Sequence, residues 1–322
     1  MRKTFIILLL GILSCAAIIA SLAAGEGNGL FAAFRDILTG NHSPDAAVML
    51  YMRLPRVCTA LVVGASLAVC GALFQSIVKN PLADPYTLGV SGGASFGAAA
   101  AIIIALPYPV VALIALFCAL AAALVVFSLS RSLNAGENSV ILAGVGVNIL
   151  SSSAVMLLFA LAESHRVHKA LLWLMGDLSL ARYDALLPSA AAAAILILAA
   201  LRYAPHLNLL SYGSEYAKAA GVSKTDLRAL FIIGSFLAAV SVSLAGVIGF
   251  VGLLAPHCVR RLSGTHDNRV VMPVSALCGG SFLALCDAAG RTAAYPYELP
   301  CGVITGLVGG AALVVLLSIK KD

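Results

Sequence analysis

Long apolar runs recur along the whole chain, and they limit what it can fold into more than any other feature of the sequence. A bilayer has a hydrocarbon core about 30 Å thick, so a helix that crosses it needs about 20 apolar residues. The first such run begins at Thr4 and the last ends at Ile319, with no room between them for a soluble domain. With 61% hydrophobic and 11% charged residues, the chain is predicted to be a single transmembrane domain over residues 1–322. Helices satisfy every backbone polar group in lipid, so the expected fold class is all-α.

About ten spanning helices are expected. They leave an outer loop at about residues 25–56 and an inner loop at about residues 203–228. The first run could be a signal peptide, but its apolar core is longer than the roughly 7 to 15 residues of a cleavable signal, so a retained span is expected. The predicted spans are Thr4–Ala24, Val57–Val78, Tyr86–Leu106, Val110–Leu129, Val140–Ala162, Leu186–Leu201, Ala229–Ile248, a short one at Phe250–Leu262, Val270–Ala289 and Gly302–Ile319.

Lys and Arg residues fall unevenly on the two sides of this topology. With ten spans both termini share one side, which collects 13 of the 20 Lys and Arg residues and leaves 7 on the other. Positive loops are retained in the cytoplasm, so a multi-pass protein of the cell membrane with both termini cytoplasmic is predicted. The net charge of +6 then reflects topology, and no basic patch with interleaved aromatic residues indicates nucleic-acid binding. The seven outer positions are Arg35, Arg53, Arg56, Arg166, Lys169, Arg182 and Arg291.

Patterns that would indicate catalysis or nucleotide binding are weak or missing. Residues 89–93 satisfy G-x-S-x-G around Ser91, but a nucleophile elbow joins a strand to a helix, and here the flanks are predicted membrane helices. The sequence contains no G-x-x-x-x-G-K-[ST], so any ATP must be bound by another subunit. The eight cysteines are scattered singly, and no His/Cys group has metal-ligand spacing. We therefore expect no catalytic residue, no metal and no cofactor.

Charged residues gather at the predicted outer boundary. Arg53 and Arg56 precede the second span and could either anchor the chain at lipid headgroups or bind an acidic partner. Asp287 and Arg291 lie four residues apart near the outer end of the ninth span. This spacing predicts an ion pair on one helical face, which would lower the cost of placing a charge at membrane depth.

Polar residues also line one face of the fifth span and fill the inner loop. Gly144, Asn148, Ser151 and Val155 recur at helical spacing, which suits either a water-lined path or hydrogen bonds between helices. In the inner loop, residues 214–220 predict a short helix that Ser214 caps and Gly221 ends, and residues 223–226 open a second helix. Such short helices could lie on lipid or fit a groove in a partner.

Several long motifs occur in a fixed order. The first half contains "RLPR" (53–56), "GASLAVCGALFQ" (64–75) and "NPLADPYTLGVSGGASFGA" (80–98), and the last of these runs into the third span. In the second half, "GVIGFVGLLAPHCVRRLSGTHDNRVVMPVSALCGG" (246–280), "CDAAGR" (286–291) and "ELPCGVITGLVGG" (298–310) follow. Together they resemble the FecCD-type permeases, the membrane subunits of ATP-binding cassette (ABC) importers for ferric siderophores, heme and cobalamin. Ala311 and Ala312 depart from the family, which commonly has a proline and an aromatic residue there.

The resemblance implies a ten-helix type II importer fold and a set of partners. These are a second permease subunit, either an identical copy or a paralogue, two cytoplasmic ATPase subunits and an extracytoplasmic substrate-binding protein. It also implies roles for residues at matching positions. Outer arginines dock the binding protein, part of the inner loop couples to the ATPase, and the fifth span lines the path behind a gate. The matching positions are Arg53, Arg56 and Arg291 for docking, Glu215, Ala217, Lys218 and Gly221 for coupling, and Asn148 and Ser151, with Asn138 and Ser139, for the path and gate.

Import of an iron-siderophore, heme or cobalamin-type complex is the function that the sequence favours. An ion-gradient-driven secondary transporter is the alternative, and it would be expected to carry ionisable residues near the bilayer midplane. The sequence places none convincingly there. An intramembrane enzyme would rest on Ser91 alone. The choice of cargo stays open, because the external binding protein would largely set it.

Overall fold

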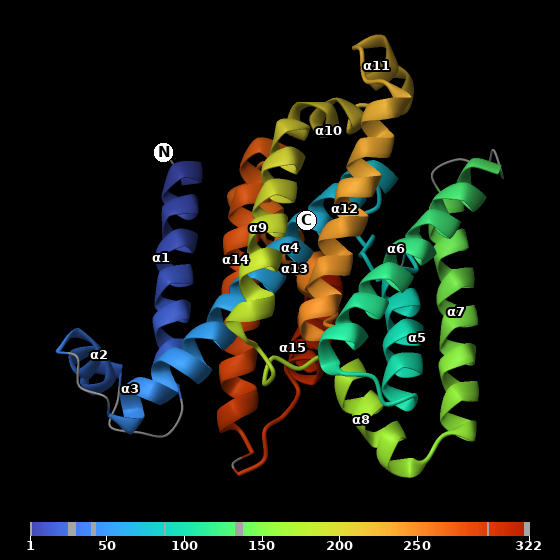
Figure 1. Ribbon diagram of the computed structural model, residues 1–322. Helices are drawn as coiled ribbons and strands as arrows, with labels where there is room; N and C mark the ends of the chain where they lie inside the picture. Colours follow the sequence, from blue (N-terminus) through green and yellow to red (C-terminus); the bar gives the residue numbers. More distant parts are fainter. Residues whose placement is uncertain are drawn as a thin grey trace.

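The computed structural model describes residues 2–24, 30–39, 43–86, 88–132, 138–294 and 296–318, and these residues form helices and connecting coil without a strand (Figure 1). The helices at the ten predicted spans are α1 (Arg2–Ala23), α4 (Leu54–Val78), α5 (Val90–Ile103), α6 (Tyr108–Ser132), α7 (Asn138–Leu161), α9 (Tyr183–Arg202), α12 (Lys224–Ala245), α13 (Val251–Ser263), α14 (Asn268–Thr292) and α15 (Cys301–Ser318). The connections contain α2 (Leu30–Leu38), α3 (Pro44–Val48), the π-helix η1 (Met49–Arg53), α8 (Ser164–Leu174), α10 (Ala204–Leu210) and α11 (Ser214–Ala219). Each predicted span therefore coincides with a helix, and the predicted outer loop is partly helical.

Seven of these helices, among the described residues, are long and apolar enough to cross a membrane. Helices α5, α13 and α15 are shorter: α5 has 14 residues and α13 has 13. At 1.5 Å per residue, α5 and α13 extend about 20 Å and the 18-residue α15 about 27 Å, which is less than the hydrocarbon thickness of about 30 Å. The expected third span from Tyr86 is wrong at its start, because α5 begins only at Val90.

The unwound segments before α5 and α13 contact each other inside the bundle. Gly89 (φ 84°) and Phe250 (φ 68°) have left-handed backbones that delay the start of each helix. The backbone N–H of Ile248 donates to the hydroxyl of Tyr86 over 2.9 Å. The side chain of Asn148 donates to the carbonyl of Tyr86 over 2.7 Å. Backbone that is not helical at this depth is tolerated because such contacts satisfy its polar groups.

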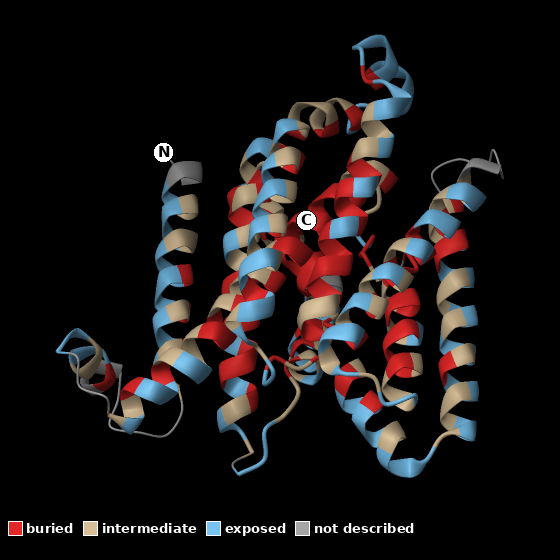
Figure 2. Ribbon diagram, viewed as in Figure 1, coloured by how far each residue is buried: buried red, intermediate tan, exposed pale blue. Residues whose placement is uncertain are grey.

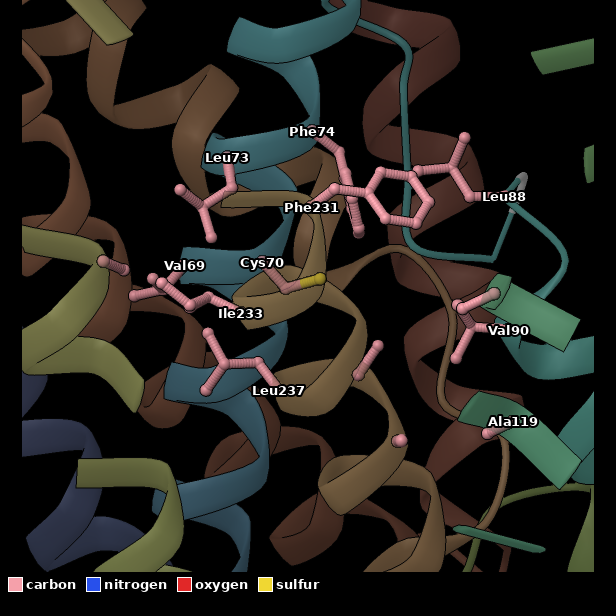
Figure 3. Packing of buried hydrophobic residues seen from close by; sticks show 14 of the residues in the cluster. Val69, Cys70, Leu73, Phe74, Leu88, Val90, Ala119, Phe231, Ile233 and Leu237 are labelled. Carbon is pink, nitrogen blue, oxygen red and sulfur yellow. The ribbon is translucent and has the colours of Figure 1, made fainter. Parts of the chain in front are cut away.

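Helix α4 lies at the centre of the bundle and packs against α12, α13 and α14 (Figure 2). Figure 3 shows Phe74 of α4 against Phe231 of α12, whose rings meet edge to face with centroids 5.5 Å apart. Small residues allow the backbones to approach closely. A Cβ at Gly71 would lie 1.8 Å from the carbonyl oxygen of Gly252, and one at Gly64 would lie 2.4 Å from that of Gly279. Glycine at these positions therefore fixes how close α13 and α14 come to α4.

The glycines of the third span have the packing role that the sequence suggested. A Cβ at Gly93 would lie 2.5 Å from the carbonyl oxygen of Cys118, and one at Gly97 would lie 2.7 Å from the sulfur of the same residue. Both contacts join α5 to α6. Ser91 begins α5 after coil, and its hydroxyl lies 3.4 Å from the carbonyl of Tyr86, so the geometry gives no strand-to-helix elbow there.

The two ends of the bundle differ. Helices α2, α3 and α8 lie at one end, here called the α8 end, and α10 and α11 lie at the other, the α11 end (Figure 1). Helix α1 starts on the α11 side, and α4 crosses the bundle obliquely between the two ends.

Candidate functional site

A group of four charged side chains joins distant parts of the chain at the α8 end. Arg56 at the start of α4 pairs with Asp287 of α14 (Nε–Oδ1, 2.8 Å) and with Glu298 before α15 (Nη1–Oε2, 2.8 Å). Arg291 lies 3.1 Å from the other oxygen of Asp287, without the alignment of a hydrogen bond. We call these four residues the outer ion-pair network. The predicted pair of Asp287 and Arg291 is confirmed, and the sequence analysis missed the links to Arg56 and Glu298.

Three of the four side chains in the outer ion-pair network are buried, and this determines its structural role. The side chain of Asp287 is 1% exposed, those of Arg291 and Arg56 are 9% and 10% exposed, and that of Glu298 is 52% exposed. A buried charge is strongly unfavourable unless a partner and hydrogen bonds compensate it. The network therefore fixes the ends of α4, α14 and the coil before α15 together. Glu298 is the one member of the network for which the sequence predicted no role, and its signal is a lone carboxylate before the last span.

The three arginines predicted to dock a partner are engaged to different degrees. Arg291 also donates to the carbonyls of Ser21 (3.0 Å) and Ala24 (3.2 Å) at the end of α1. Arg53 donates to the carbonyl of Leu22 over 3.4 Å and is half-buried. Arg53 is thus more accessible than Arg56 or Arg291, whose guanidinium groups are held inside the network.

The network borders a cavity of about 1430 Å³ at the α8 end. Its lining comes mainly from α4, α6, α9 and α12, and it includes Arg53, Arg56 and Glu298. Figure 1 shows α6 and α9 on opposite sides of α12.

The α11 end carries the predicted coupling segment, and its helix boundaries follow capping rules. The N–H of Val222 donates to the carbonyl of Ala217 and that of Gly221 to Lys218, which is the Schellman pattern, with Gly221 left-handed at φ 95°. The stop at Gly221 is confirmed. Ser214 is not the cap, because Gly213 takes that position without a side-chain hydrogen bond. Ser223 and Asp226 form the predicted start of α12 as a capping box.

The predicted coupling residues split into exposed and buried groups. Glu215 and Lys218 pair over 2.6 Å, with side chains 86% and 59% exposed. The hydrogen bond from Lys218 holds the pKa of the Glu215 carboxyl below its ordinary value. Gly221 is exposed, whereas Ala217 is buried at 1%. The methyl group of Ala217 therefore packs α11 against the bundle and cannot itself form a surface for a partner.

A hydrogen-bonded cluster that the sequence analysis missed anchors this segment. The side chain of Asn208 in α10 donates to Asp267 over 2.6 Å and accepts from the N–H of Asn268 over 2.8 Å. Ser76, near the end of α4, donates to Asn268 over 3.3 Å. Asp267 also caps α14 through the N–H of Arg269. The cluster thus ties α10 to α4 and α14, and only the Asp at the start of α14 could have been recognised, as a cap.

Replacing Asp267 by alanine is expected to lower the apparent unfolding temperature at neutral pH. Helix α14 would lose its cap, which is worth about 1 kcal/mol, and α10 would lose the hydrogen bond between Asn208 and Asp267. The N–H of Arg269 and then Asn208 hold the pKa of Asp267 below its ordinary value. Its stabilising charge is therefore fully present above about pH 4 and is lost as the pH falls through the lowered pKa. Thermal unfolding should show a gap between D267A and the parent that narrows in acid. The D267N variant, which keeps an acceptor, should lose less, and a constant gap would contradict this account.

The polar stripe of α7 faces α5. Asn148 accepts from the N–H of Gly92 over 3.2 Å, besides its bond to Tyr86. A Cβ at Gly92 would lie 3.2 Å from that of Ser151, and Val155 on the same face is buried. Of the two interpretations of the stripe, these contacts are those of hydrogen bonding between helices. Ser139 is buried at 6%, and the side chain of Asn138 lies outside the described residues.

Known proteins resemble this chain over almost its whole length. The sequence pattern of the FecCD transport family matches residues 10–319. The hemin transport system permease protein HmuU of Yersinia pestis is 34% identical over 98% of this chain and 96% of its own. The vitamin B12 import system permease protein BtuC of Escherichia coli is 33% identical over 97% of this chain and 94% of its own.

A third permease and a solved transporter structure are also similar to this chain. The Fe(3+)-citrate import system permease protein YfmD of Bacillus subtilis is 36% identical over 83% of this chain and 80% of its own. A solved structure of a metal-chelate type ABC transporter in an inward-facing conformation covers 98% of this chain and 99% of its own, with 29% identity and a TM-score of 0.86.

Proposed function

This chain belongs to the FecCD transport family, and from that premise we propose that it is the permease subunit of an ABC importer for an iron-siderophore, heme or cobalamin-type complex. The family match over residues 10–319 carries the proposal. Relatives named for hemin, vitamin B12 and Fe(3+)-citrate support cargo of this class, a metal held in a large organic ligand.

The proposed partners are inferred from the missing phosphate-binding loop and from the exposed face of α7. Because its sequence has no phosphate-binding loop, ATP is hydrolysed on a separate subunit, and we assign two of these to the α11 end. That end is then cytoplasmic, as the excess of Lys and Arg predicted. A second permease subunit, identical or paralogous, completes the path. The face of α7 away from α5 presents exposed Leu150, Ser152, Ser153 and Met156 to it or to lipid.

ATP hydrolysis by the complex reconstituted in liposomes tests this function. The rate should rise when the external binding protein is added, and the stimulation should be largest when that protein carries its metal chelate. A rate that responds to no binding protein loaded with a siderophore, heme or cobalamin would contradict the proposed cargo class.

Reversing the charge of Glu215 is expected to reduce ATP-driven uptake at least about tenfold, because we propose that α11 docks against the ATPase. The side chain is 86% exposed, so the E215K permease should fold normally. Co-purification of the ATPase measures the docking directly. Glu163→Lys, at an exposed position of the α8 end, is the matched control. Equal ATPase recovery from E215K and the parent would remove Glu215 from the interface.

Reversing Arg53 is expected to weaken capture of the external binding protein about tenfold, a change of about 1.4 kcal/mol. Arg53 suits this test better than Arg56, because a carboxylate at position 56 would face Asp287 and Glu298 and disturb the fold. Binding can be measured on permease in nanodiscs. Arg35→Glu, whose side chain is 76% exposed in α2, is the control. If R53E binds as the parent does, Arg53 anchors the chain and does not dock a partner.

A further inference from the structure

The cavity beside the outer ion-pair network is built like a site for an amphipathic ligand. Its walls carry Ala112 and Leu116 from α6 and Pro188 and Ala192 from α9, all without charge. Two hydroxyl groups of the lining bond to their own helices: Thr59 donates to the carbonyl of Pro55 over 2.8 Å, and Ser243 to that of Val240 over 2.9 Å. Ser189 and Tyr108 also line the cavity, so this part of the lining is largely apolar with a few hydroxyl groups.

Charged side chains make up the other part of the lining, here called the arginine rim. The lining includes the four arginines Arg53, Arg56, Arg182 and Arg291 against the two carboxylates Asp184 and Glu298, and Asp287 lies behind it, so four positive charges face three negative ones. Arg182 is 79% exposed and pairs with Asp184 at 3.5 Å, itself 85% exposed. Exposed pairs of this kind contribute little, so Arg182 can exchange its partner for another anion.

The length of the cavity along α9 and the apolar surface at its edge both suit a ligand that enters from the membrane. On α9 the lining runs from Asp184 to Ala192, which at about 1.5 Å per residue is about 12 Å along the helix, close to the thickness of one hydrocarbon leaflet. Leu113 and Leu180, which also line the cavity, are 53% and 55% exposed, so its edge lies on apolar protein surface. An acyl chain in the cavity would bury the apolar part of the lining.

We propose that this cavity binds one anionic phospholipid of the leaflet at the α8 end. Its acyl chain lies between α6 and α9, and its phosphate lies at the arginine rim with Arg182 as the exchangeable cation. Arginine matches phosphate because its planar guanidinium group donates two parallel hydrogen bonds. The proposed lipid site requires only that the chain spans a bilayer. It does not depend on which cargo the importer carries.

Lipid retention on the purified full-length permease tests the site. The protein is exchanged into detergent with phosphatidylglycerol and phosphatidylcholine, and bound lipid is counted by native mass spectrometry. We expect one phosphatidylglycerol per chain, retained by the parent and by Ala191→Trp, whose position on α9 is exposed outside the lining. The cavity-filling variants Ala112→Trp and Ala192→Trp should each lose it, and Arg182→Gln should weaken it several-fold. Inorganic phosphate at millimolar concentration should not displace it, which separates a lipid from a free anion.

Photo-crosslinking gives a second readout on the unaltered chain, in case a tryptophan variant fails to fold. Phosphatidylglycerol with a diazirine in its acyl chain should label peptides of α6 and α9 that include Ala112 or Ala192. The proposal is overturned if the parent retains no phospholipid, if both folded filling variants retain as much as the parent, if phosphate alone displaces the ligand, or if labelling avoids these walls.

Discussion

Replacing Gly71 by valine is expected to prevent the permease from folding. A Cβ at this position would lie 1.8 Å from the carbonyl oxygen and 2.5 Å from the carbonyl carbon of Gly252, both backbone atoms of α13. Helix α4 passes through the middle of the bundle, so neither helix can retreat without opening the core around Phe74. The loss should exceed the 4 to 5 kcal/mol or so that marks exceptional substitutions. Membrane extracts should yield no monodisperse protein.

The matched control is Gly11→Ala in α1, where a Cβ meets no atom within 4 Å. Alanine has the higher helix propensity, by about 1 kcal/mol, so this variant should be recovered like the parent. A monodisperse G71V protein with parental unfolding behaviour would show that α4 and α13 are not packed as described.

Replacing Asp287 by asparagine is expected to destabilise the permease by about 3 to 5 kcal/mol, the usual range when one partner of a buried ion pair is removed. Asparagine keeps the shape of the side chain, but Arg56 and Arg291 would then share only Glu298 as a counter-charge. The unfolding temperature in detergent should fall sharply, and uptake should fall with it.

Two further variants separate charge from shape. Glu298→Gln should change stability by about 1 kcal/mol or less, because that carboxylate is half-exposed. Adding Arg56→Gln to Asp287→Asn should recover part of the loss, since it removes one of the uncompensated cations. A D287N protein as stable as the parent, or a double variant less stable than both single variants together predict, would contradict the assigned network.

Local rules in the sequence predicted local structure. The helix start at residues 223–226, the helix stop at Gly221 and the pair of Asp287 and Arg291 were predicted, and all three depend on contacts within a few residues, where helical spacing fixes geometry. The long apolar runs likewise located the helices, because a bilayer demands them.

Contacts between residues far apart in the sequence could not be predicted from these local rules. Arg56 and Asp287 are 231 residues apart, and Asn208 and Asp267 are 59 apart, so only the folded bundle brings them together. The start of α5 was also mispredicted, because hydropathy near Tyr86 does not reveal that the hydroxyl of this residue accepts a hydrogen bond from Ile248 and that the helix begins only at Val90. For Asn148 the periodicity indicated the correct face of α7, but it could not identify α5 as the partner.

Uptake into liposomes with and without the ATPase tests the central claim most directly. Permease reconstituted with its ATPase, internal ATP and the external binding protein should accumulate the metal chelate, and omission of ATP or of the ATPase should reduce uptake to background. An imposed proton or sodium gradient should not restore it. Undiminished uptake without the ATPase, or uptake driven by the gradient alone, would instead identify an ion-coupled secondary transporter.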